Sequence, residues 1–307
     1  MSLRAYRQAE QRLFDNAGIA PREEWIRLRR VGTRARVLSV GTGEPVLFLS
    51  GGPDAGATWA HAAAGMTGSR CLMLDRPGTG LSDRLDEPPN VSTLPHYVAD
   101  LTVDVLDALG IEQALVVGCS FGGYSALRSA AEHPERIKGV YLAGCPAFVP
   151  GWTPPKMAAP LRIPVIGRFL PRLPATRQSM LMSMRLYGHQ HSLSAQQIPP
   201  ALLDWVLAWQ RHTDTLTNDA AMIRNVGTWR GGFDPSLDFT ADALAEIKVP
   251  CKVLVGTDDT VGGADVGQRL ASALDAQLEV WPDAGHLPWY DDHIRFAASV
   301  RDFAMSL

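Results

Sequence analysis

The chain has 307 residues with a formal net charge of −3, and 46% of its residues are hydrophobic and 20% charged. This balance is ordinary for a globular protein with a sizeable core, and it excludes the strongly basic composition of many nucleic-acid-binding chains. The chain has neither the apolar stretch of about 18 residues that a spanning helix needs nor the apolar segment of an N-terminal signal peptide, so we expect a cytoplasmic protein.

Short apolar runs alternate along the chain with segments that carry apolar residues at helical spacing. Most of these runs are rich in Val, Leu and Ile without alternation, which is typical of strands buried on both faces. The predicted strands span residues 35–40, 45–49, 70–74, 114–117, 137–143, 251–255 and 277–281. Their order predicts the α/β class, with a mostly parallel, doubly wound sheet that is covered by helices on both faces.

The alternation stops between residues 146 and 236. This segment begins with a series of prolines and contains no strand-like run. Its helical patterns cover residues 179–186, 200–212 and 219–226. We expect residues 146–236 to form a helical cap (lid), inserted into an α/β core made of residues 1–145 and 237–307. A structural excursion with no role in binding is the alternative.

The run Gly118-Cys119-Ser120-Phe121-Gly122 fits the pattern G-x-S-x-G of a nucleophile elbow. The pattern alone is weak, but here a buried-strand run precedes it and a helical pattern follows it. Glycines are needed because neighbouring side chains would clash in the sharp turn that pushes the serine oxygen clear of the sheet. The context predicts that Ser120 is an activated nucleophile.

A serine hydroxyl needs a base, and the base needs a carboxylate that orients it. His286 directly follows the last predicted strand and is the expected base. Asp259 lies three residues after the strand-ending Gly256 and is the expected carboxylate, with Asp258 as the alternative. The chain order Ser, Asp, His differs from the orders of chymotrypsin and subtilisin.

Two backbone amides are expected to stabilise the negative oxygen of a tetrahedral intermediate. One is the amide of Phe121, the residue after the nucleophile. The other is assigned to Gly52 in the loop after residues 45–49, because glycine lets the backbone approach a ligand closely.

In their order along the chain, these motifs resemble the α/β-hydrolase superfamily, in its serine-nucleophile subgroup with a helical cap. The likeness runs from about Glu24 onward and includes the segment from Asp75 to Asp83. Members usually carry histidine where this chain has Ser50, and the change leaves the fine geometry of that loop open. The resemblance implies the fold of that superfamily and a Ser-His-Asp triad.

The predicted cap carries nine Lys and Arg residues but only four Asp, so it is basic above an acidic core. This charge indicates either attraction of an anionic substrate or an ordinary solvated surface. His189 and His191 form an H-x-H pair in the cap, for which a surface loop and a metal pair are both open. The cap is also rich in Met and Trp, and we expect four of these side chains to line an apolar substrate pocket: Trp152, Met182, Trp205 and Trp209.

The leading hypothesis is a serine hydrolase that forms an acyl-enzyme with a small, largely apolar carboxylic ester. A carbon–carbon bond hydrolase, a lactonase, a proline iminopeptidase-like enzyme, a lyase or transferase, and a ligand-binding module of the same fold are the alternatives. The expected partner is a small-molecule substrate, with no nucleic acid, no membrane, no cofactor and no metal ion. A homodimer is left open.

Overall fold

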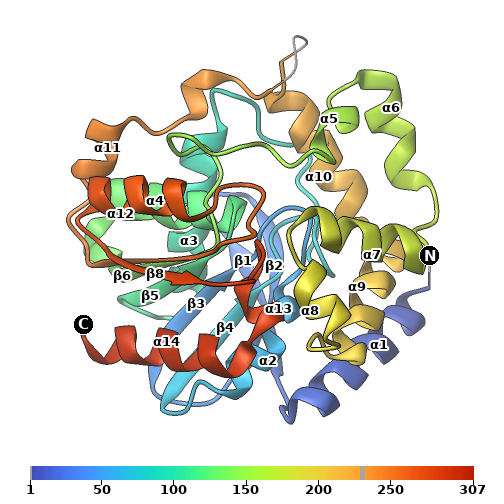
Figure 1. The fold of residues 1–307 in the computed structure, drawn as a ribbon, viewed down its shortest axis with the longest axis horizontal. Coiled ribbons are helices and arrows are strands. Elements are labelled where there is room, and N and C mark those ends of the chain that lie inside the picture. Colours follow the sequence, from blue (N-terminus) through green and yellow to red (C-terminus); the bar gives the residue numbers. More distant parts are fainter. Residues whose placement is uncertain (1, 229–231) are drawn as a thin grey trace.

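A sheet of eight strands separates two layers of helices in the computed structural model, which describes residues 2–228 and 232–307 (Figure 1). The strands are β1 (Arg22–Leu28), β2 (Thr33–Val40), β3 (Glu44–Leu49), β4 (Ser69–Leu74), β5 (Ala114–Gly118), β6 (Ile137–Ala143), β7 (Cys251–Gly256) and β8 (Gln277–Trp281). Their order across the sheet is β1-β2-β4-β3-β5-β6-β7-β8. β2 is antiparallel to both of its neighbours and the other pairs are parallel, so the predicted α/β class is confirmed.

All seven predicted strands form, and burial explains why the sequence marks them. Every residue of β5 is buried, as expected for a central parallel strand with helices on both sides. β1 was not predicted, because it lies at the edge of the sheet and only Ile26 and Leu28 are buried in it. Its other residues are polar or exposed and give no apolar run.

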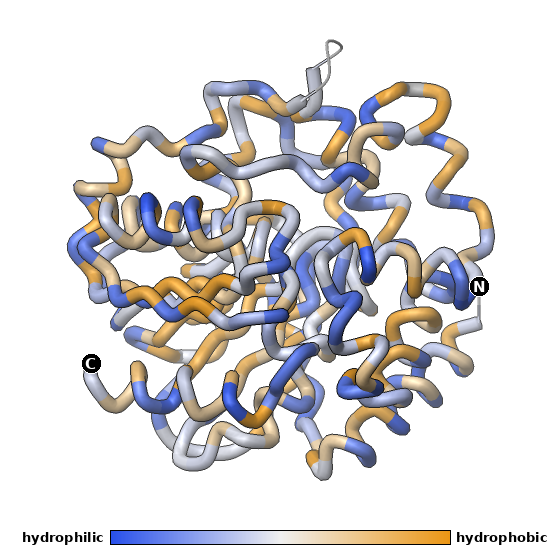
Figure 2. Tube along the Cα trace, viewed as in Figure 1, coloured by the Kyte–Doolittle hydropathy of each residue, from blue (hydrophilic) through white to orange (hydrophobic). Residues whose placement is uncertain are grey.

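Helices cover both faces of the sheet, and the strands between them are the most hydrophobic part of the trace (Figure 2). The buried side chains on one face come from α3 (Leu94–Ala108), α4 (Phe121–Glu132), α11 (Ala241–Ala245) and α12 (Ala264–Leu274). Those on the other face come from α1 (Leu3–Ala17), α2 (Ala60–Ala64), α13 (Pro288–Asp291) and α14 (His293–Met305). The short 3₁₀ turns of the core are η1 (Gly56–Trp59), η2 (Pro134–Arg136) and η4 (Pro235–Leu237).

The segment between β6 and β7 is helical, and we call residues 146–236 the insert. It contains α5 (Ala158–Leu161), α6 (Pro164–Phe169), η3 (Leu170–Arg172), α7 (Arg177–Leu186), α8 (Gln190–Ser194), α9 (Pro200–His212) and α10 (Thr215–Val226). α9 matches its predicted range, whereas α7 and α10 begin two and four residues earlier than predicted. Trp229 and Arg230, which the sequence places in the insert, lie outside the described residues.

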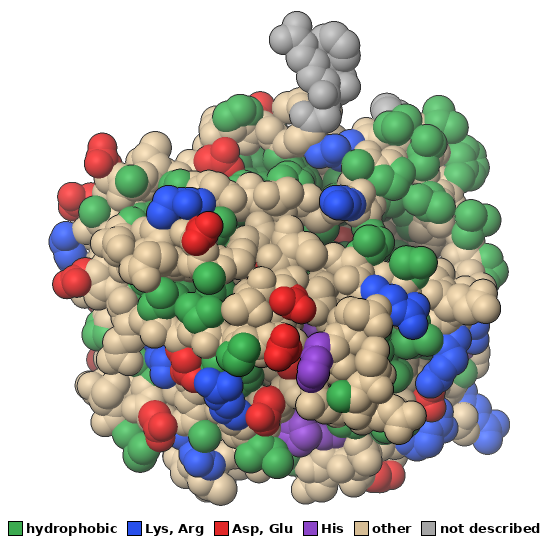
Figure 3. Space-filling view, viewed as in Figure 1, with side chains coloured by type: hydrophobic (Ala, Val, Ile, Leu, Met, Phe, Trp, Pro, Cys, Tyr) green, Lys and Arg blue, Asp and Glu red, His purple; other side chains and the backbone are tan. Residues whose placement is uncertain are grey.

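Apolar side chains gather on the outer surface of the insert, over α5 and α6 (Figure 3). We call α5, α6 and η3 together the arc. Its exposed apolar residues, with those directly flanking its helices, are Ile163, Val165, Ile166, Phe169, Leu170 and Leu173. Within the described ranges, no helix is both long enough and apolar enough to cross a membrane.

Candidate active site

Ser120 lies at the tight turn between β5 and α4. Its backbone has φ 53° and ψ −117°, a strained conformation that residues with a Cβ rarely adopt. The neighbouring glycines make this turn possible, because a Cβ at Gly118 would collide with the carbonyl of Gly122, and a Cβ at Gly122 would collide with the carbonyl of Leu49. The turn therefore presents Ser120 to a cavity above the sheet, of which it is a lining residue.

His286 and Asp259 meet at the carboxyl ends of β8 and β7. His286 Nδ1 lies 3.0 Å from each carboxylate oxygen of Asp259, and both residues are buried. Because carboxylate oxygens can only accept, Nδ1 carries the proton and Nε2 is the unprotonated nitrogen of the neutral ring. Nε2 is buried and has no hydrogen-bond partner among the described residues, so it is free to accept a proton.

Asp259 is held as a carboxylate by its surroundings. Its oxygens accept hydrogen bonds from the amides of Cys145 (3.0 Å) and Val261 (2.8 Å) in addition to His286. Burial alone would raise the pKa of Asp259, but the charge and hydrogen bond of His286 and these two amides outweigh it and hold the pKa below its ordinary value. Asp258, the alternative acid, is exposed and turned toward Thr257.

Two amides are available near Ser120. Among the described residues, no hydrogen bond uses the N–H of Gly52 or of Phe121. Phe121 is the first residue of α4, so its amide also carries the partial positive charge of a helix N-terminus. Ser50, at the position where the superfamily usually has histidine, is fully buried, and its hydroxyl oxygen has no partner within the described part of the chain.

A cavity of about 540 Å³ lies between the insert and the carboxyl ends of the strands. Of the four side chains predicted to line a pocket, Trp152 and Trp209 line this cavity and Trp205 and Met182 do not. Trp205 is one helical turn before Trp209 and is fully buried in the core cluster beneath. Met182 is 55% exposed, because it lies on the face of α7 opposite the buried residues Met180 and Met184.

The loop that carries His286 is fastened to the insert by a set of hydrogen bonds that we call the clasp, which joins residues 187–192 to residues 285–291. The amide of His286 donates to the carbonyl of Tyr187 (2.8 Å), and the two rings stack with centroids 5.4 Å apart. His189 Nε2 accepts from the amide of Leu287 (3.2 Å), so Nδ1 is the protonated nitrogen and donates to Asp291 (2.9 Å).

The clasp decides between the two interpretations of the H-x-H pair. His189 is fully buried within the clasp, whereas His191 is exposed on α8. Among the described residues, no group of three or more His, Cys, Asp or Glu is arranged to hold a metal ion. His189 is thus neither a surface residue nor half of a metal pair, and its partner Asp291 gave no signal in the sequence.

Two acidic side chains line the cavity although the sequence analysis did not predict them there. Asp54 follows Gly52 and Pro53 in the loop after β3, and Asp219 comes from α10 of the insert. Burial raises the pKa of Asp54 to about 7, although a hydrogen bond from the Ala55 amide and the charge of Arg76 act against it. The only sequence signal for Asp54 was its place directly after the glycine and proline of that loop.

The comparisons with known proteins agree with this architecture. The model of the alpha/beta hydrolase family matches residues 46–299 of the chain. The 2-hydroxy-6-oxononadienedioate/2-hydroxy-6-oxononatrienedioate hydrolase of Paraburkholderia phymatum is 29% identical over 297 residues, covering 92% of this chain and 96% of the relative. The pimeloyl-(acyl-carrier protein) methyl ester esterase of Chromobacterium violaceum is 27% identical over 275 residues, covering 88% and 95%. Carboxylesterase CesB of Bacillus subtilis has a similar crystal structure, with a TM-score of 0.74 at 20% identity over 98% of this chain and 96% of that chain.

Proposed function

The chain belongs to the alpha/beta hydrolase family and is a hydrolase, and from this premise we propose that it cleaves a small, largely apolar carboxylic ester with Ser120 as nucleophile. The observation that carries the proposal is the pair of Nδ1–carboxylate contacts between His286 and Asp259. They favour the tautomer in which Nε2 is the base, in a chain whose strained turn presents a serine to the cavity above the sheet.

In the proposed reaction, Ser120 Oγ attacks the ester carbonyl and His286 Nε2 takes its proton. Asp259 stabilises the imidazolium that forms. The tetrahedral intermediate collapses, and Nε2–H donates the proton to the departing alkoxide, which leaves as an alcohol. A water molecule then attacks the acyl-enzyme with His286 again as base, and the carboxylic acid is released as Ser120 regains its proton.

The oxyanion of both intermediates is assigned to the amides of Gly52 and Phe121. Neither N–H has another partner in the described structure, so no hydrogen bond must break when the charge develops. We propose that the insert is the cap of this site, because its helices supply much of the wall of the cavity that Ser120 lines. Apolar side chains from α5, η3, α9 and α10 form part of that wall, and its remaining lining is also mainly apolar, which suits an apolar acyl or alcohol group.

A second candidate is the hydrolysis of a carbon–carbon bond next to a ketone, and sequence similarity favours it. Several relatives are named as hydrolases of 2-hydroxy-6-oxo-dienoates, including the one from Burkholderia cepacia at 28% identity over 280 residues. The same nucleophile and base would serve both reactions, because both pass through attack on a carbonyl. The compounds in those names carry carboxylates, however, and the described residues that line the cavity include no Lys, Arg or His.

The proposal is tested by labelling and by turnover. A fluorophosphonate probe should modify Ser120, located by mass spectrometry, and 4-nitrophenyl esters of increasing acyl length should be hydrolysed. An absence of adduct at Ser120 would remove the hydrolase mechanism. Turnover of 2-hydroxy-6-oxo-6-phenylhexa-2,4-dienoate without turnover of any ester would select the second candidate instead.

Matched aspartate variants test the assignment of the acid. Asp259→Asn should lower kcat about 10⁴-fold, because an amide in that position no longer holds His286 in the working tautomer. Asp258→Asn is the control, since it makes the same change on the next residue, which is exposed, and it should alter kcat by less than about twofold. The reverse result would move the role to Asp258.

A further inference from the structure

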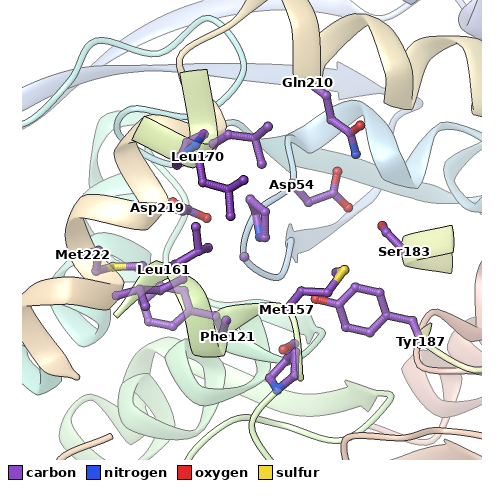
Figure 4. Close-up of a pocket in the computed structure, with 18 of the residues that line it drawn as sticks. Asp54, Phe121, Met157, Leu161, Leu170, Ser183, Tyr187, Gln210, Asp219 and Met222 are labelled. Carbon is purple, nitrogen blue, oxygen red and sulfur yellow. The ribbon is translucent and has the colours of Figure 1, made fainter. Parts of the chain in front are cut away.

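The charged groups on the wall of the cavity are all of one sign. Among the described lining residues, the ionisable acids are Asp54 and Asp219, and no lysine, arginine or histidine is present. Figure 4 shows the Asp54 and Asp219 side chains around the cavity, with Ser183 and Gln210 on the same side of the view as Asp54. The remaining wall is mostly apolar, so a negatively charged group inside it would find hydroxyl and amide donors but no cation.

The cation nearest to this wall is already engaged. Arg76 Nη2 donates to Asp219 Oδ2 (3.0 Å) and to the carbonyl of Gly51 (2.8 Å), and the guanidinium lies 5.1 Å from the ring centroid of Phe121. Arg76 is 1% exposed and does not line the cavity. It therefore balances the charge of Asp219 from behind and leaves none for a bound anion.

Asp54 also disfavours a negatively charged ligand, from another part of the cavity wall. Its carboxyl is buried beside the Gly52 amide that is assigned to the oxyanion, and it accepts a hydrogen bond from its own neighbour Ala55 (2.8 Å). As a neutral carboxyl it offers one O–H donor but no compensating charge, and as a carboxylate it repels an anion. The charge state of Asp54 therefore changes the strength of the discrimination and not its direction.

The basic residues of the insert lie outside the cavity. Arg168 and Arg172 are exposed on α6 and η3, and no described basic residue of the insert lines the cavity wall. Of the eight described basic residues of the insert, six are exposed; Arg224 and Arg162 are half-buried, and Arg162 lies over the ring of the lining residue Phe233 (5.8 Å to the centroid) without lining the cavity itself. The excess of positive charge in the insert does not provide a site for a carboxylate of the substrate.

We propose that this site selects neutral acyl groups and rejects acyl groups that carry a carboxylate. The inference rests on the proposed function, because it concerns the substrate of the same cavity. Its physical basis is the cost of removing a carboxylate from water into an apolar space where no cation compensates it, which amounts to several kcal/mol for an ion in a protein interior. A neutral ester group of the same length carries no such cost.

The test uses two ligands of equal length, 4-nitrophenyl methyl adipate and mono-4-nitrophenyl adipate, which differ only in whether the far end is a methyl ester or a carboxylate. Their binding to the Ser120→Ala variant is measured by calorimetry at pH 8, and their kcat/KM values are measured on the wild-type protein. The neutral ligand should bind Ser120→Ala, and be hydrolysed by the wild type, about 100-fold better than the anionic one. Equal or tighter binding of the anionic ligand would overturn the inference.

Two variants test whether Asp54 and Asp219 cause the preference for the neutral ligand over the anionic one. Asp54→Asn should reduce the preference at pH 8 because it removes a repelling charge from the wall. Asp219→Asn should reduce it further because Arg76 is then left as an unbalanced cation behind the wall. Asp86→Asn, at an exposed position away from the cavity, is the control and should keep the wild-type ratio. An unchanged ratio in both wall variants would also contradict the proposal.

Ester hydrolysis and charge selection are tested by different measurements. If the wild type hydrolyses neither ester and Ser120 takes no fluorophosphonate label, the ester-hydrolase function fails. The binding ratio on Ser120→Ala still decides the charge selection in that case, because it needs no turnover.

Discussion

Replacing His189 should slow the chemical step although the residue does not line the cavity. Its two ring nitrogens bridge the amide of Leu287, directly after His286, and the carboxylate of Asp291, further along the same segment. Removing the ring leaves the partly buried Leu287 N–H without an acceptor, which costs about 1–3 kcal/mol. If the chain relieves this cost by shifting the backbone of His286, the base is displaced, and we expect kcat to fall by about 5- to 150-fold.

Three substitutions at this position separate the two bonds. His189→Gln places an acceptor near the position of Nε2 and should preserve the bond from Leu287, whereas His189→Asn places a donor near the position of Nδ1 and should preserve the bond to Asp291. We expect kcat to fall in the order wild type, Gln, Asn, Ala, with Gln the least affected, because the Leu287 amide is directly next to His286. KM should stay nearly constant, since no cavity-lining atom is removed.

The assay is steady-state hydrolysis of a neutral 4-nitrophenyl ester together with the rate of fluorophosphonate labelling of Ser120. His191→Asn is the matched control, because His191 is exposed on the same short helix and should leave both rates unchanged. A lower melting temperature with unchanged kcat in all three His189 variants would refute the reasoning, since the clasp would then stabilise the fold without positioning the base.

Three further predictions concern stability and reactivity. The Asp54 carboxyl binds its proton more tightly in the folded chain, with a pKa of about 7, than in the unfolded chain, near 3.8. Its contribution to the free energy of unfolding is therefore complete below about pH 4 and falls by up to about 4 kcal/mol as the pH rises to about 7. Asp54→Asn should flatten this dependence in thermal melts, and a curve parallel to the wild type would contradict it. Glu10→Ala removes a carboxylate from the fully buried Arg36 and should lower the free energy of unfolding in urea by about 3 kcal/mol, whereas Glu44→Ala, at an exposed pair, should change it by less than about 1 kcal/mol. All four cysteines are buried, so iodoacetamide at pH 8 should modify them only after denaturation, and modification of the folded protein would show that this burial is wrong.

The sheet could be predicted, and candidate triad residues could be proposed at its strand ends, because both depend on local patterns. A strand that is buried on both faces consists mostly of apolar residues. The turn around Ser120 needs glycines at 118 and 122 because any larger residue would collide with the backbone there. Asp259 and His286 follow strand ends that the same patterns reveal. The edge strand β1 has no such pattern, because only two of its side chains are buried.

The lining of the cavity could not be predicted in the same way. Composition indicates that the insert is rich in Met and Trp, but the helical phase decides which of them face inward, and on α7 that phase turns Met180 and Met184 inward and Met182 outward. Asp219 and Arg76 lie more than a hundred residues apart in the chain and meet only through the packing of α10 on the loop after β4. A single sequence gives no local sign of such a pair.

The insert is fastened to the core at several places, which include the clasp, the packing of α1 on α9 and the Arg76–Asp219 ion pair, and this limits how a ligand reaches Ser120. The clasp holds residues 187–192 to the loop of His286, and α1 packs along α9 in the same buried cluster. A hinge motion of the whole insert would have to break these contacts at once. The arc of α5, α6 and η3 takes part in none of them, and its residues Leu161 and Leu170 and the flanking Leu173 line the cavity. We therefore expect ligand exchange to depend on a local opening of this arc and not on a hinge motion of the whole insert.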